Sequence, residues 1–385
     1  MSTSGQAAQS AQSVAALMRA RVADGRLPGG VVAGGVGGEA GDNVLAVGVQ
    51  DLASGTPVAP DTLFFWDSLG KPVIAAVVLT FVAEGLLALD TPVTRWLPEL
   101  AGPRVLVEAT GDLNETVASD REATVEDLLT LRGGLGYIPD FEADYSVRLF
   151  ADLQEGHHGE VSREQYLAAA AAMPLAHQPG QGWTYNTGAT LLGLLVERVG
   201  GASLDELTAT RVLTPLGMDD TTWWVDAARR PRFASRYVDS ADGVRLVDAA
   251  DGVHAAPPSF PDGAGALIGP VGDWVRFARM LAGGGELDGV RVLPKELVSA
   301  MMTDHLDDAQ RAMGGFFLTD VEGQGWGYGG SVRPDGSYGW AGSAGTWGRV
   351  DPATGELLVV FTQLALHGPQ GSALFDEVDQ VWGAR

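Results

Sequence analysis

The stretch Phe64-Phe65-Trp66-Asp67-Ser68-Leu69-Gly70-Lys71-Pro72 decides how the rest of this sequence is interpreted. Ser68 and Lys71 are three residues apart, a spacing that puts both side chains on one face of a helix. A serine at the start of a buried helix lies at the positive end of the helix dipole, which favours developing negative charge. A lysine in an apolar setting can lose its proton and act as a base, which arginine cannot. The pair therefore predicts a serine nucleophile and an activating amine, which work through an acyl-enzyme.

Lysine is rare in this chain. Lys71 and Lys295 are its two lysines, and its other cationic side chains, histidine aside, are arginine. A lysine kept three residues after a serine therefore indicates a position that needs a removable proton. The alternative is a lysine that lies along the surface at the start of a helix. The apolar run 72–89 follows directly and contains Glu84 and Gly85, which favours a buried core helix over a membrane span.

Strand signals lie at both ends of the chain, with helices between them. Two Val-rich runs around a Gly-rich turn, 29–37 and 43–49, predict a hairpin, and 357–364 is the clearest strand near the C-terminus. The order predicts a mixed α/β fold with one sheet built from both chain ends and an inserted all-helical lobe. We expect a single unit, with residues 1–66 and 250–385 in an α/β lobe and 67–249 in a mainly helical lobe. The clearest predicted helices are 124–129, 163–173, 189–199 and 273–281.

Composition limits the possible partners and cofactors. The 385 residues include 49 Asp and Glu against 25 Lys and Arg, a net charge of −24. Such a surface repels phosphate backbones and anionic lipids, so we expect neither a nucleic-acid nor a membrane partner. The absence of cysteine excludes disulfides and thiolate metal sites, and the six histidines show no metal spacing. The N-terminal residues do not have the pattern of a signal peptide, so we expect a cytoplasmic protein, while the oligomeric state stays open.

Around the Ser-x-x-Lys motif, the chain resembles the serine β-lactamase and penicillin-recognising superfamily, specifically its class C-like carboxylesterase branch. The resemblance implies the β-lactamase/DD-peptidase fold, with an antiparallel sheet flanked by helices, and an esterase that needs no metal or organic cofactor. The segment 64–72 is similar to the nucleophile segment of the family. Further segments similar to family landmarks follow in the family's order: 83–93, 128–135, 179–185, 191–193, 263–267 and 277–281.

The resemblance also implies the remaining site residues. Tyr185, in the segment Pro-Gly-x-x-Trp-x-Tyr, corresponds to a catalytic tyrosine that takes the serine proton, directly or through the lysine, and returns it to the leaving group. The segment Trp340-Ala341-Gly342-Ser343 corresponds to the third motif. There the backbone N–H of Ser343 would pair with that of Ser68 as the oxyanion hole, and Gly342 would let the strand approach the substrate. Tyr137 stands where esterases of this branch often have a pocket tyrosine.

Two departures from the β-lactamase pattern concern the substrate. The family usually has asparagine two residues after the tyrosine, where this chain has Thr187, which is shorter and has no amide. Asn186 would point away from the site if the segment is extended. Trp340 stands where β-lactamases carry the lysine of Lys-Thr-Gly, so a carboxylate-bearing lactam loses its cationic partner.

We therefore expect a serine carboxylesterase that hydrolyses small, uncharged esters. One alternative keeps the fold and changes the bond: a β-lactamase, a D-amino-acid amidase or peptidase, or an acyltransferase. A second alternative is a binding homologue without turnover. The sequence does not decide whether Lys71 or Tyr185 is the general base.

Overall fold

The computed structural model describes residues 3–41, 43–154, 161–240, 243–319, 321–366 and 369–384. Within these ranges the central sheet has seven strands in the order β11-β12-β13-β14-β15-β1-β2, and all neighbours are antiparallel. Since β1 pairs with β15, the sheet joins the two ends of the chain, as predicted. The strands are β1 (Gly29–Val36), β2 (Val44–Gly48), β11 (Gly325–Trp326), β12 (Ser331–Val332), β13 (Tyr338–Gly342), β14 (Thr346–Val350) and β15 (Glu356–Thr362).

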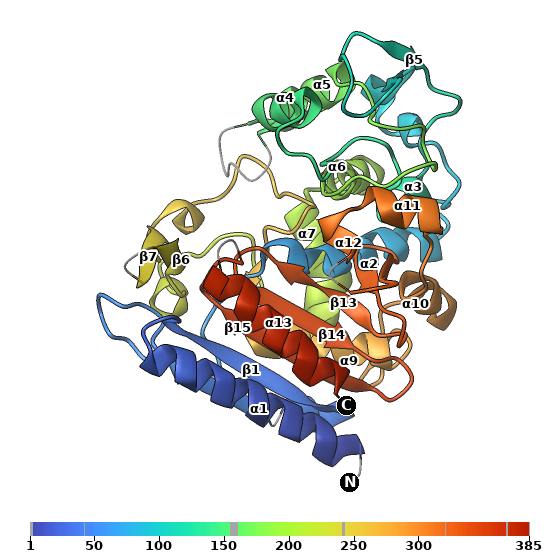
Figure 1. Cartoon of the computed structure of the whole chain (residues 1–385). Helices are drawn as coiled ribbons and strands as arrows, with labels where there is room; N and C mark the ends of the chain where they lie inside the picture. The colour runs from blue at the N-terminus through green and yellow to red at the C-terminus, as the bar shows by residue number, and fades with distance from the viewer. Residues whose placement is uncertain are drawn as a thin grey trace.

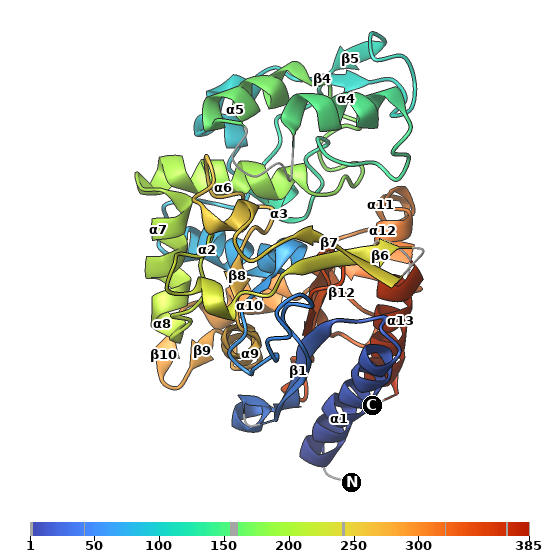
Figure 2. The same ribbon diagram turned by 90° about the vertical axis from the view of Figure 1, so that its left-hand side faces the viewer.

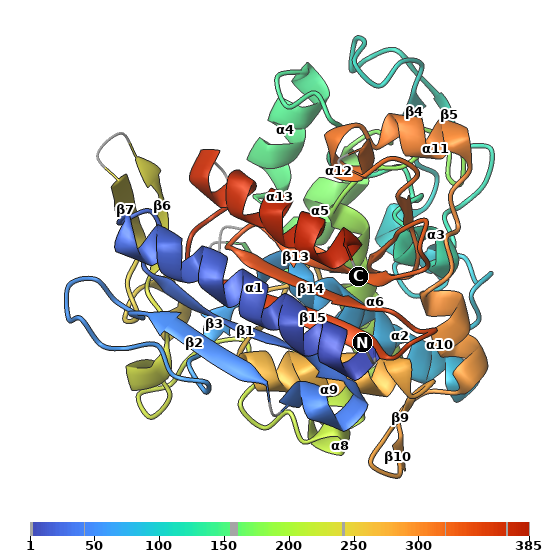
Figure 3. The same cartoon turned by 60° about the horizontal axis from the view of Figure 1, so that its bottom comes forward.

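Helices cover both faces of this sheet. The terminal helices α1 (Thr3–Ala23) and α13 (Pro369–Gly383) lie side by side across one face (Figures 1 and 3). On the other face, α9 (Val271–Ala282) packs against β14, β15 and β1. Side chains of β15 alternate between the two layers: Leu358 and Val360 pack with the terminal helices, and Val359 packs with the core around α9. This alternation follows from the two-residue period of a strand.

The helical part of the molecule lies beyond α9, around α2 (Lys71–Ala83), which packs against α6 (Thr187–Gly200) (Figure 2). Side chains in α2 are buried from Lys71 to Phe81, which is why this apolar run forms an internal helix. Capping boxes begin two of the predicted helices, with Thr124 before α3 and Ser162 before α5. The other helices are α3 (Val125–Leu129), α4 (Asp144–Leu153), α5 (Arg163–Ala172), α7 (Leu204–Thr208), α8 (Thr214–Leu216), α10 (Lys295–Met301), α11 (Asp308–Met313) and α12 (Phe316–Thr319).

Four short two-stranded sheets complete the strands of the described ranges. Two of them, formed within residues 104–118 and 236–248, lie inside the range 67–249 that the sequence predicts as mainly helical. The division into lobes at residues 66 and 250 stays a prediction. None of the helices in the described part of the chain has the length and hydropathy needed to cross a membrane. The pairs are β3 (Phe64–Phe65) with β8 (Ile268–Gly269), β4 (Arg104–Leu106) with β5 (Thr116–Ala118), β6 (Arg236–Ser240) with β7 (Gly243–Asp248), and β9 (Glu286–Leu287) with β10 (Val290–Arg291).

Candidate active site

Ser68 and Lys71 meet at the start of α2. Ser68 lies in a 3-10 turn, Asp67–Gly70, that continues directly into the helix, whose first residue is Lys71. The ammonium nitrogen Nζ of Lys71 donates hydrogen bonds to Ser68 Oγ at 2.9 Å and to the carbonyl oxygen of Ala264 at 2.5 Å. The lysine is 1% exposed and the serine 8% exposed. A buried amine that directly contacts the serine hydroxyl can accept its proton, so the predicted pair has the contact that the chemistry needs.

Two glycines allow other segments to approach this turn closely. A Cβ atom on Gly265 would lie 2.1 Å from the carbonyl oxygen of Asp67, and one on Gly342 would lie 2.0 Å from that of Trp66. Neither distance is possible for a real side chain, so both positions require glycine. The approach of Gly342 brings the end of β13 against the turn that carries Ser68.

Ser343 also lies against this turn. Its hydroxyl donates a hydrogen bond to the carboxylate of Asp67, and both Ser68 and Ser343 line the same cavity. Asp67 has a positive φ of 52°, a conformation that costs a residue with a side chain of order 1–3 kcal/mol. The contact with Ser343 helps to hold this conformation. The structure thus brings together the two residues whose backbone N–H groups are predicted to form the oxyanion hole.

Tyr185 lies beside Lys71 on the other side of the site. The centre of its ring is 4.8 Å from Lys71 Nζ, and the ring of Phe317 stacks on it with centres 4.5 Å apart. The indole Nε1 of Trp340 donates a hydrogen bond to Tyr185 Oη at 2.7 Å. This hydrogen bond holds the phenol oxygen in one position, which suits a group that gives and takes a proton.

Tyr137 and Asn186 form the part of the wall next to Tyr185. Tyr137 exchanges two backbone hydrogen bonds with Tyr185, of 2.8 and 2.9 Å, and Asn186 Nδ2 lies 3.4 Å from the Tyr137 hydroxyl. Asn186 has a φ of +78° and lines the cavity. The expectation that it points away from the site was wrong, because the backbone there is not extended. Asparagine tolerates positive φ better than most residues, a signal that could have identified this position from the sequence.

Three residues expected to contact substrate are not among the described residues that line the cavity. Thr187 is the first residue of α6 and is fully buried, and its hydroxyl has no hydrogen-bond partner in the described ranges. The Trp340 indole is directed to the tyrosine hydroxyl, and Gly342 faces the backbone of Trp66. These three residues therefore contact other residues of the protein rather than the cavity, while Tyr137 lines the cavity as predicted.

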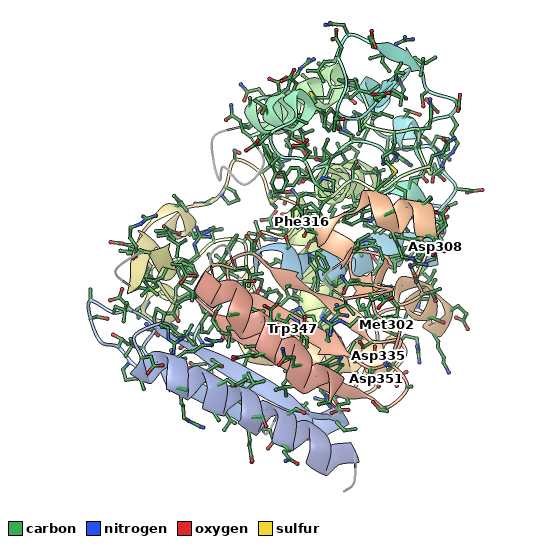
Figure 4. All side chains as sticks on the ribbon, in the orientation of Figure 1. Met302, Asp308, Phe316, Asp335, Trp347 and Asp351 are labelled. Atoms are coloured by element: carbon green, nitrogen blue, oxygen red, sulfur yellow. The ribbon has the colours of Figure 1, made fainter. Side chains whose placement is uncertain are left out.

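The cavity has a volume of about 670 Å³, and its lining is mostly apolar and includes eight phenylalanine and tyrosine rings. Phe316, at the start of α12 (Figure 4), is 47% exposed and lies 5.6 Å from the ring of Phe141, so apolar surface continues outward from the wall. A concave, mostly apolar site with few polar groups is typical of small-molecule binding. Among the eight rings, the sequence identified those of Tyr137 and Tyr185. The others were not predicted, since they come from separate segments without a shared motif: Phe65, Phe141, Phe150, Tyr166, Phe260 and Phe317.

Polar residues in the wall suit hydrogen bonding to an organic ligand better than metal binding. Asp67, Asp262 and His254 line the cavity, yet no three metal-ligating side chains in the described ranges are grouped so that they could hold a metal ion. What the arrangement can do is bind an apolar molecule and place a carbonyl group next to Ser68.

Comparison with known proteins agrees with this arrangement. The model of the Beta-lactamase family matches residues 14–380. An uncharacterised protein of Mycobacterium tuberculosis is 38% identical over 334 residues, or 83% of this chain and 82% of that protein. Esterase EstB of Burkholderia gladioli is 31% identical over 367 residues, or 88% of this chain and 86% of the esterase. Among solved structures, EstCE1, described as a hydrolase with promiscuous acyltransferase activity, superimposes with a TM-score of 0.77 at 23% identity, covering 98% of this chain and 99% of its own.

Proposed function

The chain belongs to the Beta-lactamase family, and from this premise we propose that it is a serine carboxylesterase with Ser68 as its nucleophile. The observation that carries the proposal is the 2.9 Å hydrogen bond between Lys71 Nζ and Ser68 Oγ, on the wall of an aromatic cavity. The similarity to esterase EstB supports an ester as the bond that is cleaved. The chain is thus a serine-hydrolase type of enzyme, and the ester is the specific part of the proposal.

The proposed reaction has two halves. Ser68 Oγ attacks the carbonyl carbon of the ester, while its proton passes to Lys71, directly or with the help of Tyr185. The backbone N–H groups of Ser68 and Ser343 bind the oxyanion of the tetrahedral intermediate. When this intermediate collapses, the carbon–oxygen bond to the alcohol breaks and the alcohol oxygen receives the proton. Water then attacks the acyl-enzyme and loses a proton to the same groups. The bond between the acyl carbon and Ser68 Oγ breaks, Oγ takes this proton, and the acid is released.

The surroundings of Tyr185 favour esters over β-lactams. The donor that reaches its hydroxyl is the neutral indole of Trp340, so no ammonium group occupies this place to bind a substrate carboxylate. Cleavage of a simple ester needs neither a cationic partner for a substrate carboxylate nor recognition of an amide. The replacement of the β-lactamase lysine by Trp340 therefore weakens the binding of lactams more than it slows the cleavage of simple esters.

A second candidate is acyl transfer to an alcohol. The acyl-enzyme would be the same, and an alcohol in place of water would receive the acyl group. The observation that favours it is the cavity itself, since a volume of about 670 Å³ with a mostly apolar lining can hold an organic acceptor and disfavours water. The printed description of EstCE1 includes such an activity. The ratio of transfer to hydrolysis at increasing alcohol concentration measures this possibility.

Hydrolysis of short p-nitrophenyl esters, together with phosphonate labelling and peptide mapping, tests the proposal. We expect the phosphonate on the peptide that contains Ser68, and loss of at least about a thousandfold in kcat for Ser68→Ala. Ser54→Ala, in an exposed turn, is the matched control and keeps full activity. Labelling at another residue, or faster turnover of a chromogenic cephalosporin than of any ester, would refute the assignment.

A further inference from the structure

The cavity wall contains a guanidinium group that the proposed mechanism does not use. Arg236 is the first residue of β6, and its side chain, 26% exposed, lines the same cavity as Ser68. Its Cζ atom lies 4.9 Å from the centre of the Phe65 ring, which also lines the cavity. Phe65 precedes Ser68 by three residues, and three residues of chain span at most about 11 Å. The guanidinium therefore lies within reach of a substrate that is bound at the serine.

Most of the hydrogen-bonding capacity of this guanidinium is unused. Its closest approach to an acid is through Nε, 3.6 Å from Asp248 Oδ2, which is an ion pair but too long for a hydrogen bond. Nε has no hydrogen-bond partner among the described residues, and no hydrogen bond from either Nη atom is found in the same ranges. The contact through Nε orients the guanidinium and leaves both Nη groups available to a ligand. Two N–H groups of a guanidinium can donate parallel hydrogen bonds to the two oxygens of one carboxylate.

The neighbours of Arg236 hold it in place. Phe65 stacks on His254 with ring centres 4.3 Å apart, and His254 Nε2 lies 3.7 Å from the same Asp248 oxygen. Asp248 Oδ1 accepts a hydrogen bond from the backbone N–H of Val253. The arginine thus lies over a fixed aromatic ring and next to a fixed carboxylate, so little of its side-chain entropy is left to lose when a ligand binds.

The two carboxylates in the cavity wall, in contrast, already have donors. Asp262 Oδ1 accepts from the backbone N–H of Ala264 at 2.9 Å, and Asp67 accepts from the hydroxyl of Ser343. Both acids line the cavity. Arg236 therefore offers a ligand unused donors, whereas each acid already accepts a hydrogen bond from within the protein.

We propose that Arg236 binds a carboxylate of the substrate, so that this enzyme acts on esters with a negatively charged substituent away from the ester group. The inference rests on the proposed esterase function, since it names the substrate class of the same site. It revises the expectation of uncharged esters, because the aromatic wall takes the apolar body of the substrate and Arg236 takes the charge. The place differs from that of Trp340, where β-lactamases have their cation, so the proposal does not imply a lactam.

Pairs of esters that differ only in charge test the proposal at physiological ionic strength. On the acyl side, the mono-p-nitrophenyl esters of adipic and suberic acid are compared with the same esters in which the free acid is a primary amide. On the alcohol side, meta- and para-butyryloxybenzoate are compared with the corresponding benzamides. We expect kcat/KM to favour the acid over the amide in one of the two series by about ten- to a hundredfold, the range of a charge-assisted pair.

Variants of Arg236 show whether this residue is responsible. Arg236→Gln should abolish the preference for the acid, and Arg236→Lys should keep only part of it, because lysine retains the charge without the fork. Arg245→Gln is the matched control: Arg245 lies on β7 of the same hairpin, is exposed, and does not line the cavity. The ratio of acid to amide within one preparation does not depend on how much of a variant is folded.

The outcomes separate the two proposals. If the neutral amide esters are hydrolysed in a Ser68-dependent way but neither series favours the acid, or Arg236→Gln leaves the preference intact, the role of Arg236 is refuted and the esterase stands. If no ester in either series is hydrolysed, the esterase function itself fails, and the inference about Arg236 fails with it.

Discussion

The indole Nε1 of Trp340 donates a 2.7 Å hydrogen bond to the hydroxyl oxygen of Tyr185, a residue 155 positions earlier in the chain. The contact joins β13 to the segment before α6. It places a neutral donor where, by the resemblance to β-lactamases, a lysine would be expected. The tyrosine is therefore oriented by a group that cannot lose its own proton in the pH range of the reaction.

Replacing this donor should slow the chemical step. Trp340→Phe keeps an aromatic ring and removes the hydrogen bond, so we expect kcat to fall about ten- to a hundredfold, with KM changed much less. Steady-state kinetics with a p-nitrophenyl ester measure both. Trp347→Phe is the matched control: Trp347 (Figure 4) lies on the adjacent strand β14, does not line the cavity, and its indole donates to Asp379 of α13. Equal losses in the two variants would contradict a specific role for Trp340.

Asn186 rather than Thr187 should interact with substrate, since Asn186 lines the cavity and Thr187 does not. Asn186→Gly keeps a residue that tolerates positive φ and removes the amide, so kcat/KM should fall by about tenfold. Thr187→Val removes a hydroxyl that has no hydrogen-bond partner in the described ranges. It should leave kcat/KM within about twofold and raise the melting temperature. The opposite order of effects would show that the threonine is the residue in contact.

Gly342 should not tolerate alanine. A Cβ atom there would lie 2.0 Å from the carbonyl oxygen of Trp66, so β13 and the turn before Ser68 would have to separate. We expect Gly342→Ala to lose activity by at least about a hundredfold, because a shift of about 1 Å in the site costs that much. Gly272→Ala, in α9, is the control: nothing lies within 4 Å of its Cβ position, and it should stabilise the protein by about 0.5–1 kcal/mol. Full activity of Gly342→Ala would contradict the close approach.

Asp273 should make the protein less stable as the pH rises. Burial raises the pKa of this carboxyl to about 6, against the hydrogen bond of 2.7 Å from the Thr221 hydroxyl, which lowers it. The folded protein binds the proton of this carboxyl more tightly than the unfolded chain does. The stabilisation of the folded state that comes from this proton is therefore complete below about pH 4, and it is lost as the pH rises through about 6. The shift corresponds to about 3 kcal/mol in the free energy of unfolding.

Asparagine at this position carries no charge at any pH. Urea unfolding of Asp273→Asn should therefore show a smaller loss of stability between pH 4 and pH 8 than the wild type, with the variant relatively more stable at pH 8. Asp308→Asn is a control at an exposed acid. A wild type and an Asp273→Asn variant with the same pH dependence would show that this buried carboxyl is not responsible.

The pair Ser68 and Lys71 could be predicted from the sequence alone, because their contact depends on the geometry of one helical turn. The same holds for the capped helices and the hairpin of β1 and β2, whose signals are local in the chain. The sheet built from both ends followed from the order of strand and helix signals.

The tertiary structure alone decided which residues meet across the site. The orientation of Asn186 depends on a positive φ that neighbouring segments impose, and the wall positions of Phe141 and Arg236 depend on how separate segments pack. A local pattern reports only which neighbours in the chain can share a face, whereas a cavity is formed by residues far apart in sequence. The sequence therefore determined the contact between Ser68 and Lys71, and the packing of the chain decided which residues surround this pair.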